Sequence, residues 1–222
     1  MTDIDLLRDH VSALFVLDDD ERLVAINEPW DRSKPAPLVY VGRTLDAKLA
    51  VYWRYDMDRR LYRAISHLAR EGVYDPAVYA ELVGAGCIVE ELCYAVPPMN
   101  TEHKQCIILR PDNIDDFDLY EFYWLKDEIH TDQPCCVYIE DERAVSVCRS
   151  VRISDGHEAG LETALEYRGK GYAKHVLFAW SMQVFAMNKI PLYSTLRTNA
   201  PSRRIAEKSQ LHLFAEAFHI SM

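Results

Sequence analysis

The clearest hydrophobic pattern of this chain lies between Glu158 and Asn188. Residues Glu158–Leu165 read as a short strand, and the glycine turn Arg168-Gly-Lys-Gly171 follows it. Asn188 stands where a left-handed residue commonly ends a helix. Between the turn and Asn188, apolar residues recur every three or four positions and so share one helix face; they are Ala173, Val176, Leu177, Trp180, Val184 and Met187. The pattern predicts a strand, a glycine turn and a helix.

The same reading predicts the elements before this unit. Asp75-Pro76 is a typical helix start, with Asp as the N-cap and Pro at the first helical position. The predicted helices are Ile4–Leu17, Asp58–Glu71 and the one from Pro76 to about Gly84. The predicted strands are Arg22–Ile26, Leu38–Val41, Cys106–Leu109, Pro134–Glu140 and Ala144–Ile153. Cys87–Val96 is apolar and predicts a strand or a buried loop, and Pro97–Thr101 is the best linker candidate.

Three further segments complete the pattern. Asp112–Asp132 is acidic with interleaved aromatic residues and predicts a helix with an aromatic face. That face is either core packing or an aromatic wall of a binding pocket. Ile190–Thr195 predicts a strand, Asn199–Lys208 a helix, and Leu211–Ile220 a last strand.

Composition narrows the function. The 222 residues carry a net charge of −10 and no cluster of Lys and Arg, which argues against nucleic acid as a main partner. The sequence has no signal peptide and no membrane span, so we expect a cytoplasmic protein. The six cysteines form no Cys-x-x-Cys pair and no zinc-type spacing with histidine. We therefore expect reduced thiols and no metal.

The glycine turn predicts an anion site, because a helix N-terminus offers backbone N–H groups and glycine lets a ligand approach closely. The alternative is a plain connection between strand and helix. It is not a P-loop, since the Gly-x-x-x-x-Gly-Lys-Ser/Thr spacing is absent. It is not a dinucleotide fingerprint, because Lys174 stands where the third glycine would be.

The segment Arg168-Gly-Lys-Gly171-Tyr-Ala173 resembles the Arg/Gln-x-x-Gly-x-Gly/Ala signature of the GNAT N-acetyltransferase superfamily. Ile190–Thr195 looks like the next strand of that superfamily, and Asn199–Lys208 resembles its Asn-x-x-Ser helix. The resemblance covers about Gln105 to the end. It implies a mixed-sheet α/β (α+β) fold that binds acyl-CoA, with a GNAT-like domain over 102–222 and an N-terminal α/β subdomain over 1–101. The family usually ends with two strands, whereas one remains here, so we expect the N-terminal part to pack on the acceptor side.

The resemblance also implies a cofactor site. Acetyl-CoA would lie where the strands Leu161–Leu165 and Leu192–Leu196 splay apart, as a cosubstrate and without a metal. Pantetheine would pair with the backbone near Thr163 and Leu165. Asn199 and Ser202 match positions that touch the pantetheine arm, although Asn199 is also a strong N-cap residue. The pyrophosphate would lie on the turn and the helix start, with charge added by two lysines; these residues are Arg168, Gly169, Lys170, Gly171, Tyr172, Ala173 and Lys174.

Transfer to an amine needs a base and a proton donor. Glu158 and Glu162 share one face of their strand and are the candidate bases, with His157 on the other face. Many relatives use a tyrosine in the last helix as the donor, but this chain has Ala206 there, so Tyr193 or Ser194 are the candidates. We therefore expect an acetyl-CoA-dependent N-acetyltransferase that acts on a small-molecule or peptide primary amine. The alternatives are a non-catalytic acyl-CoA sensor and a domain whose turn binds nothing.

Overall fold

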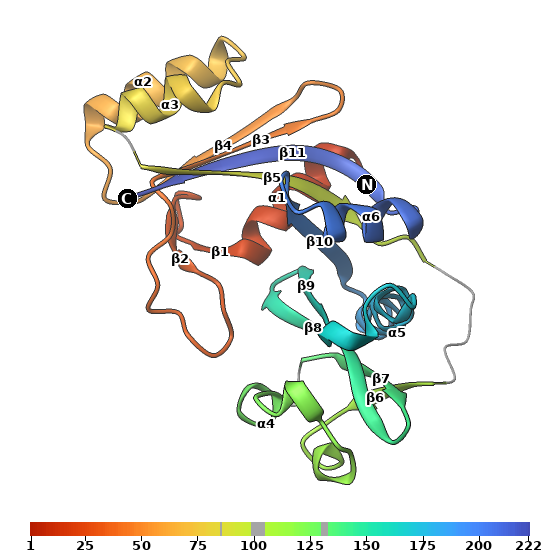
Figure 1. The fold of residues 1–222 in the computed structure, drawn as a ribbon. Helices are drawn as coiled ribbons and strands as arrows, with labels where there is room; N and C mark the ends of the chain where they lie inside the picture. The colour runs from red at the N-terminus through yellow and green to blue at the C-terminus, as the bar shows by residue number, and fades with distance from the viewer. Residues whose placement is uncertain (85, 99–104, 130–132) are drawn as a thin grey trace.

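The computed structural model describes residues 1–84, 86–98, 105–129 and 133–222. A mixed sheet of nine strands forms the centre of this part of the chain, in the order β4-β3-β11-β5-β10-β9-β8-β7-β6 (Figure 1). The strands are β3 Val39–Thr44, β4 Leu49–Trp53, β5 Cys87–Ala95, β6 Cys106–Leu109, β7 Cys135–Glu140, β8 Arg143–Ile153, β9 Gly156–Thr163, β10 Ile190–Leu196 and β11 His212–Ser221. A separate hairpin pairs β1 Phe15–Leu17 with β2 Leu23–Ile26.

Helices cover both faces of the sheet. They are α1 Asp3–Leu14, α2 Arg59–Arg70, α3 Pro76–Val83, α4 Leu125–Glu128, α5 Tyr172–Ala186 and α6 Ala200–Lys208. Leu192 of β10 packs in the core with α1, whereas Tyr193 packs in the core with α5. Because successive strand residues point to opposite faces, α1 and α5 lie on opposite sides of the sheet. No helix among the described residues is long and apolar enough to cross a membrane.

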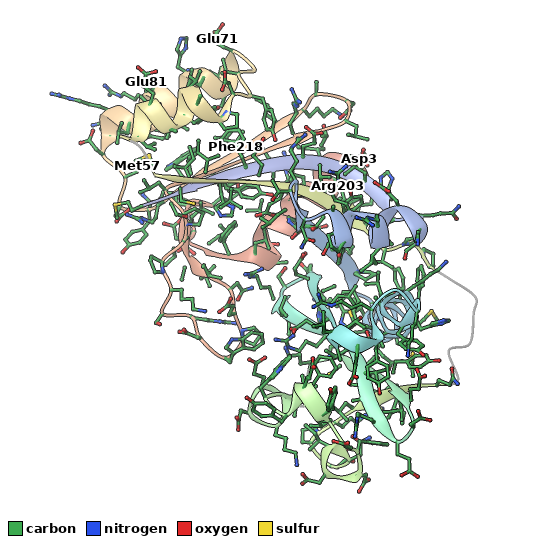
Figure 2. The ribbon with its side chains drawn as sticks, viewed as in Figure 1. Asp3, Met57, Glu71, Glu81, Arg203 and Phe218 are labelled. Carbon is green, nitrogen blue, oxygen red and sulfur yellow. The ribbon has the colours of Figure 1, made fainter. Side chains whose placement is uncertain are left out.

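A further core lies between the sheet and the helix pair α2–α3, which Figure 1 shows beside β3 and β4. Val39, Val41 and Phe218 contribute to it from the sheet, and Ile65 and Tyr79 from the helices. Figure 2 shows side chains filling the layer near the labelled Phe218. Successive residues of β3 therefore point alternately into this core and into the core under α1, as Val39, Tyr40 and Val41 do.

Strand β5 lies between β10 and β11 and is antiparallel to both. Ala95 is paired with Leu192 on one side, and Cys93 is paired with Ala215 on the other. The N-terminal part thus supplies a strand next to β10, where the sequence suggested that a closing strand was missing. The expected boundary between 101 and 102 falls within residues 99–104, outside the described part, and strands from both sides of it share one sheet.

Capping residues in the sequence mark the ends of several helices. Asp75 Oδ1 accepts a hydrogen bond from the Ala77 N–H at 2.9 Å and caps α3, and Gly84 ends that helix in the left-handed region. Asn188, two residues after the end of α5, has φ 57°. The predicted helix Ile4–Leu17 stops earlier, because its last residues form β1. Strand β4 was not predicted.

The predicted helix over Asp112–Asp132 is wrong in the residues that the structure describes. The segment instead holds 3-10 turns at Ile114–Asp116 and Tyr120–Phe122, followed by the short α4. Asp118 Oδ1 accepts from the Tyr120 N–H at 3.0 Å, and Tyr120 has φ 51°, so a local side-chain bond competes with the helical one. Three apolar residues of the segment nevertheless pack: Leu119, Phe122 and Leu125 are buried against β7 and β8. Core packing accounts for the two leucines, whereas the aromatic Phe122 is buried and also lines a cavity, and Tyr123 is 72% exposed.

Candidate functional site

The glycine turn joins β9 to α5. A 3-10 turn over Leu165–Tyr167 follows β9, and Gly169 and Gly171 then adopt φ 82° and 94°. A Cβ at either glycine would meet no atom within 4 Å among the described residues, so the turn faces open space. Helix α5 begins at Tyr172 and no side chain caps it in the described part of the chain. Its first N–H groups and its positive dipole end are therefore directed at this space.

A cavity of about 670 Å³ lies against this turn. The end of β9, the start of α5 and helix α6 form its walls. Most residues expected at a cofactor site line it; they are Thr163, Arg168, Gly169, Gly171, Tyr172, Ala173, Lys174, Asn199 and Ser202. Leu165 and Lys170 do not line it: Leu165 is 70% exposed, and the Lys170 ammonium lies 4.6 Å from the centre of the Tyr167 ring.

Four cationic side chains of the described residues line this cavity, and the sequence analysis found only two of them. Arg168 and Lys174 come from the turn and α5, whereas Arg204 and Lys208 come from α6. The missed pair is spaced i, i+4, which places both residues on one helix face. Two carboxylates, Glu121 and Glu162, also line the cavity. An acidic chain thus gathers positive charge at one place, which suits a ligand with several phosphates.

Strands β9 and β10 diverge beside the cavity. They pair in parallel from Ile190↔Gly156 to Leu192↔Glu158, and no later pair is formed among the described residues. Beyond this point β9 stays on β8 and β10 stays on β5. A second cavity of about 290 Å³ lies at the opening and is lined by residues of β5, β9, β10 and α6, among them Glu91, Leu161, Tyr193, Asn199 and Ser202.

The two candidate glutamates have different surroundings. Glu158 is 2% exposed, and its Oε1 accepts from the Ser194 N–H at 2.6 Å and from Ser194 Oγ at 2.8 Å. The Glu162 side chain is 53% exposed, lines the larger cavity and lies 3.5 Å from Nη1 of Arg149. The shared strand face therefore does not give them the same surroundings, because His10 of α1 packs against Glu158 whereas Glu162 stays half exposed.

His157 is buried on the α5 side of β9. Its Nδ1 is 2.8 Å from Ser150 Oγ, which in turn accepts from Trp180 Nε1 at 3.0 Å. The hydroxyl of Ser150 thus links the ring of His157 to the ring of Trp180. Burial, and then the nearby Lys189, lowers the pKa of His157 to about 4. It lines neither cavity and serves the core.

Tyr193 lies at the opening between the strands. Its hydroxyl donates to the carbonyl oxygen of Ser202 at 3.4 Å, and burial raises its pKa to about 12. Ser194 Oγ donates to Glu158, and Ala206 is the buried residue of α6. Asn199 Oδ1 accepts from the Ser202 N–H at 3.2 Å, so this residue caps α6 and also lines both cavities.

The sequence matches no protein-family model and no curated protein. Solved structures are similar to it. An acetyltransferase of the GNAT family from Colwellia psychrerythraea superposes with a TM-score of 0.50 at 12% identity, over 99% of this chain and 96% of that one. A GCN5-related N-acetyltransferase from Kribbella flavida gives 0.48 at 12% identity, over 83% and 86%. A GNAT-family structure from Novosphingobium aromaticivorans gives 0.45 at 15% identity, over 61% of this chain and 66% of its own. The chain thus has the expected mixed α/β, GNAT-like fold.

Proposed function

We propose that this protein is an acetyl-CoA-dependent N-acetyltransferase that acts on a primary amine of a small molecule or a peptide. One observation carries the proposal: a cavity next to two diverging parallel strands ends on an uncapped helix N-terminus with four cations around it. The acetyltransferase with the same fold, at a TM-score of 0.50, supports an acyl-transfer reaction. No metal takes part in the proposed reaction.

The phosphates of CoA fit the turn. Backbone N–H groups of Gly169–Ala173 would donate to the pyrophosphate, as helix N-termini do for anions. The cations Lys174, Arg204 and Lys208 would neutralise the remaining phosphate charge. The Arg168 Nε donates to the Thr163 carbonyl at 3.1 Å, so Arg168 also holds the turn in shape.

The pantetheine arm fits the opening between the strands. The edge of β9 that turns away from β8 has no partner strand after Glu158 among the described residues, so its backbone groups are available to the amides of the arm. Such pairing would carry the thioester toward the second cavity at Tyr193, Asn199 and Ser202.

In the reaction, the amine nitrogen bonds to the acetyl carbon, and the carbon–sulfur bond then breaks. We assign Glu162 as the base that takes the amine proton, because it is uncovered and lines the larger cavity, next to Leu161, which lines both cavities. We assign Tyr193 as the group that donates to the leaving thiolate. Glu158 acts as a positioning residue through Ser194.

Ala206 favours a second candidate, an acyl-CoA-binding protein without transfer, because the hydroxyl common among GNAT enzymes is missing there. Isothermal titration with CoA and acetyl-CoA tests binding, with Gly171→Val as the matched weak binder. Thiol release from acetyl-CoA in the presence of an amine panel tests transfer. Binding with release supports the enzyme, binding without release supports the second candidate, and no binding overturns both.

A further inference from the structure

We propose that His10, Glu91 and Cys93 bind a divalent transition-metal ion of the zinc type. One ligand atom from each residue lies within 4.8 Å of the other two. His10 belongs to α1, and Glu91 and Cys93 belong to β5. All three are buried, with exposed fractions of 0%, 8% and 0%. The site lies under α1, on the sheet face opposite α5, and is separate from the proposed phosphate site.

Two side chains of this cluster have polar atoms without a hydrogen-bond partner, whereas Cys93 Sγ lies 4.0 Å from the Tyr40 hydroxyl. Both ring nitrogens of His10 and the Oε2 of Glu91 have no hydrogen-bond partner within the described residues. Buried polar groups are nearly always paired, and buried charges are paired or bind a metal. An ion at the centre of the cluster would satisfy the imidazole and the free carboxylate oxygen together.

The types of ligand suit zinc. Imidazole nitrogen, carboxylate oxygen and thiolate sulfur are the three ligand types that zinc takes in proteins. A divalent ion would also balance the charges of the Glu91 carboxylate and the Cys93 thiolate. Two buried carboxylates, Glu91 and Glu158, lie close to the imidazole of His10.

Neighbouring groups hold two of the ligands in place. His219 Nδ1 lies 3.1 Å from Oε1 of Glu91, which leaves Oε2 of that carboxylate for the ion. Glu158 Oε2 lies 3.5 Å from Nδ1 of His10. A carboxylate beside a metal-binding histidine is a common orienting partner. The opening at Glu91 in the smaller cavity gives the ion a route from solvent.

The ion would join parts that are far apart in the sequence. It would connect α1 to the strand that completes the sheet beside β10, with Glu158 of β9 next to it. We therefore assign it a structural role. The expectation of no metal drew on sequence spacing alone, and positions 10, 91 and 93 form no known ligand motif.

The test uses the full chain after treatment with a chelator, in a Cys87→Ser background, because Cys87 is an exposed thiol. Zn²⁺ is titrated by calorimetry, and Co²⁺ is followed by the near-ultraviolet band that reports a thiolate–cobalt bond. Cys93→Ser and His10→Gln remove a ligand each. Cys148→Ser is the matched control, since Cys148 is equally buried in the sheet but outside the cluster.

We expect one equivalent of Zn²⁺ per chain in the background protein and in Cys148→Ser, with at least tenfold weaker binding in Cys93→Ser and in His10→Gln. The cobalt band should disappear in Cys93→Ser and persist in Cys148→Ser. The proposal is overturned if the background protein binds neither ion, or if Cys93→Ser binds as tightly as Cys148→Ser. Acetyl transfer is not part of the readout, so the result is independent of the proposed function.

Discussion

Glu158 holds Ser194 across the point where β9 and β10 separate. Its Oε1 accepts from the backbone N–H of Ser194 at 2.6 Å and from Oγ at 2.8 Å. Glu158 is also the β9 member of the last parallel pair, Leu192↔Glu158. The buried carboxylate of Glu158 therefore links β9 to β10 where their backbone pairing ends, and it limits how far the two strands separate.

Replacing Glu158 by Gln should destabilise the fold. The neutral amide accepts more weakly than a carboxylate, and hydrogen bonds to charged groups contribute about 1.5–3 kcal/mol. We expect the free energy of unfolding to fall by about 1–2 kcal/mol in urea titrations. Glu142→Gln, on an exposed hairpin turn, is the control and should change little. An unchanged stability in Glu158→Gln would show that the two bonds do not hold the strands.

Replacing Glu162 by Gln should remove the base and leave the fold intact. We expect the turnover number to drop about a hundredfold at neutral pH. The loss should shrink as pH rises, because more of the amine is then already neutral. The measurement is the rate of thiol release against pH, with the exposed Glu142→Gln as the control. If Glu162→Gln keeps full activity at every pH, the base lies elsewhere.

Replacing Gly171 by Val should weaken CoA binding at least tenfold, about 1.4 kcal/mol. The side chain would enter the space that faces the turn, and φ 94° would strain any non-glycine residue. Gly72→Val is the matched control, because Gly72 also has a positive φ (71°) and open space around it. It follows α2 and does not line the cavity at the glycine turn. Calorimetric titration with CoA compares the two folded variants. Equal affinities would refute the phosphate site.

His157 should make the protein less stable in mild acid. Its pKa is about 4 in the folded chain and about 6.5 when unfolded. As pH falls from about 6.5 to 4, the unfolded chain takes up a proton that the folded chain does not bind, so the free energy of unfolding decreases. We expect a contribution of about 2 kcal/mol between pH 7 and pH 5.

Urea titrations at both pH values measure this contribution. His157→Gln should show a smaller pH dependence than the wild type, whereas the exposed His67→Gln should match the wild type. An identical pH dependence in His157→Gln would assign the acid sensitivity to other groups.

A fragment that starts at Glu102 should not fold cooperatively. It lacks β5, so the facing edges of β10 and β11 lose their partner and expose unpaired backbone groups. We expect poor solubility and a broad urea transition. Co-expression with a fragment of residues 1–101 should restore both. A soluble fragment that unfolds sharply and acetylates the same amine would contradict the expectation.

Turns, caps and helix ends could be predicted from the sequence, because residues close together in the chain determine them. Gly171, Asp75 and Asn188 carry conformational preferences of their own, so the turn, the α3 cap and the end of α5 were readable. The helix predicted over Asp112–Asp132 was wrong, because apolar spacing does not show whether aspartate side chains bond to nearby backbone N–H groups and so compete with a helix.

Features that depend on distant segments could not be predicted in the same way. The different surroundings of Glu158 and Glu162 follow from the packing of α1 on β9, which strand periodicity does not contain. Arg204 and Lys208 line the cavity only because the fold places α6 beside the glycine turn. The cluster of His10 with Glu91 and Cys93 likewise forms only in the folded chain.

The position of β5 between β10 and β11 also affects how the chain is made. On the ribosome, β5 is synthesised well before either of its neighbours, so this apolar strand has no sheet partner on those two sides while most of the later chain is translated. Pairing between segments so distant in sequence is slow to form, and an unpaired strand invites association with other chains. We expect the nascent protein to depend on chaperones until β11 has left the ribosome.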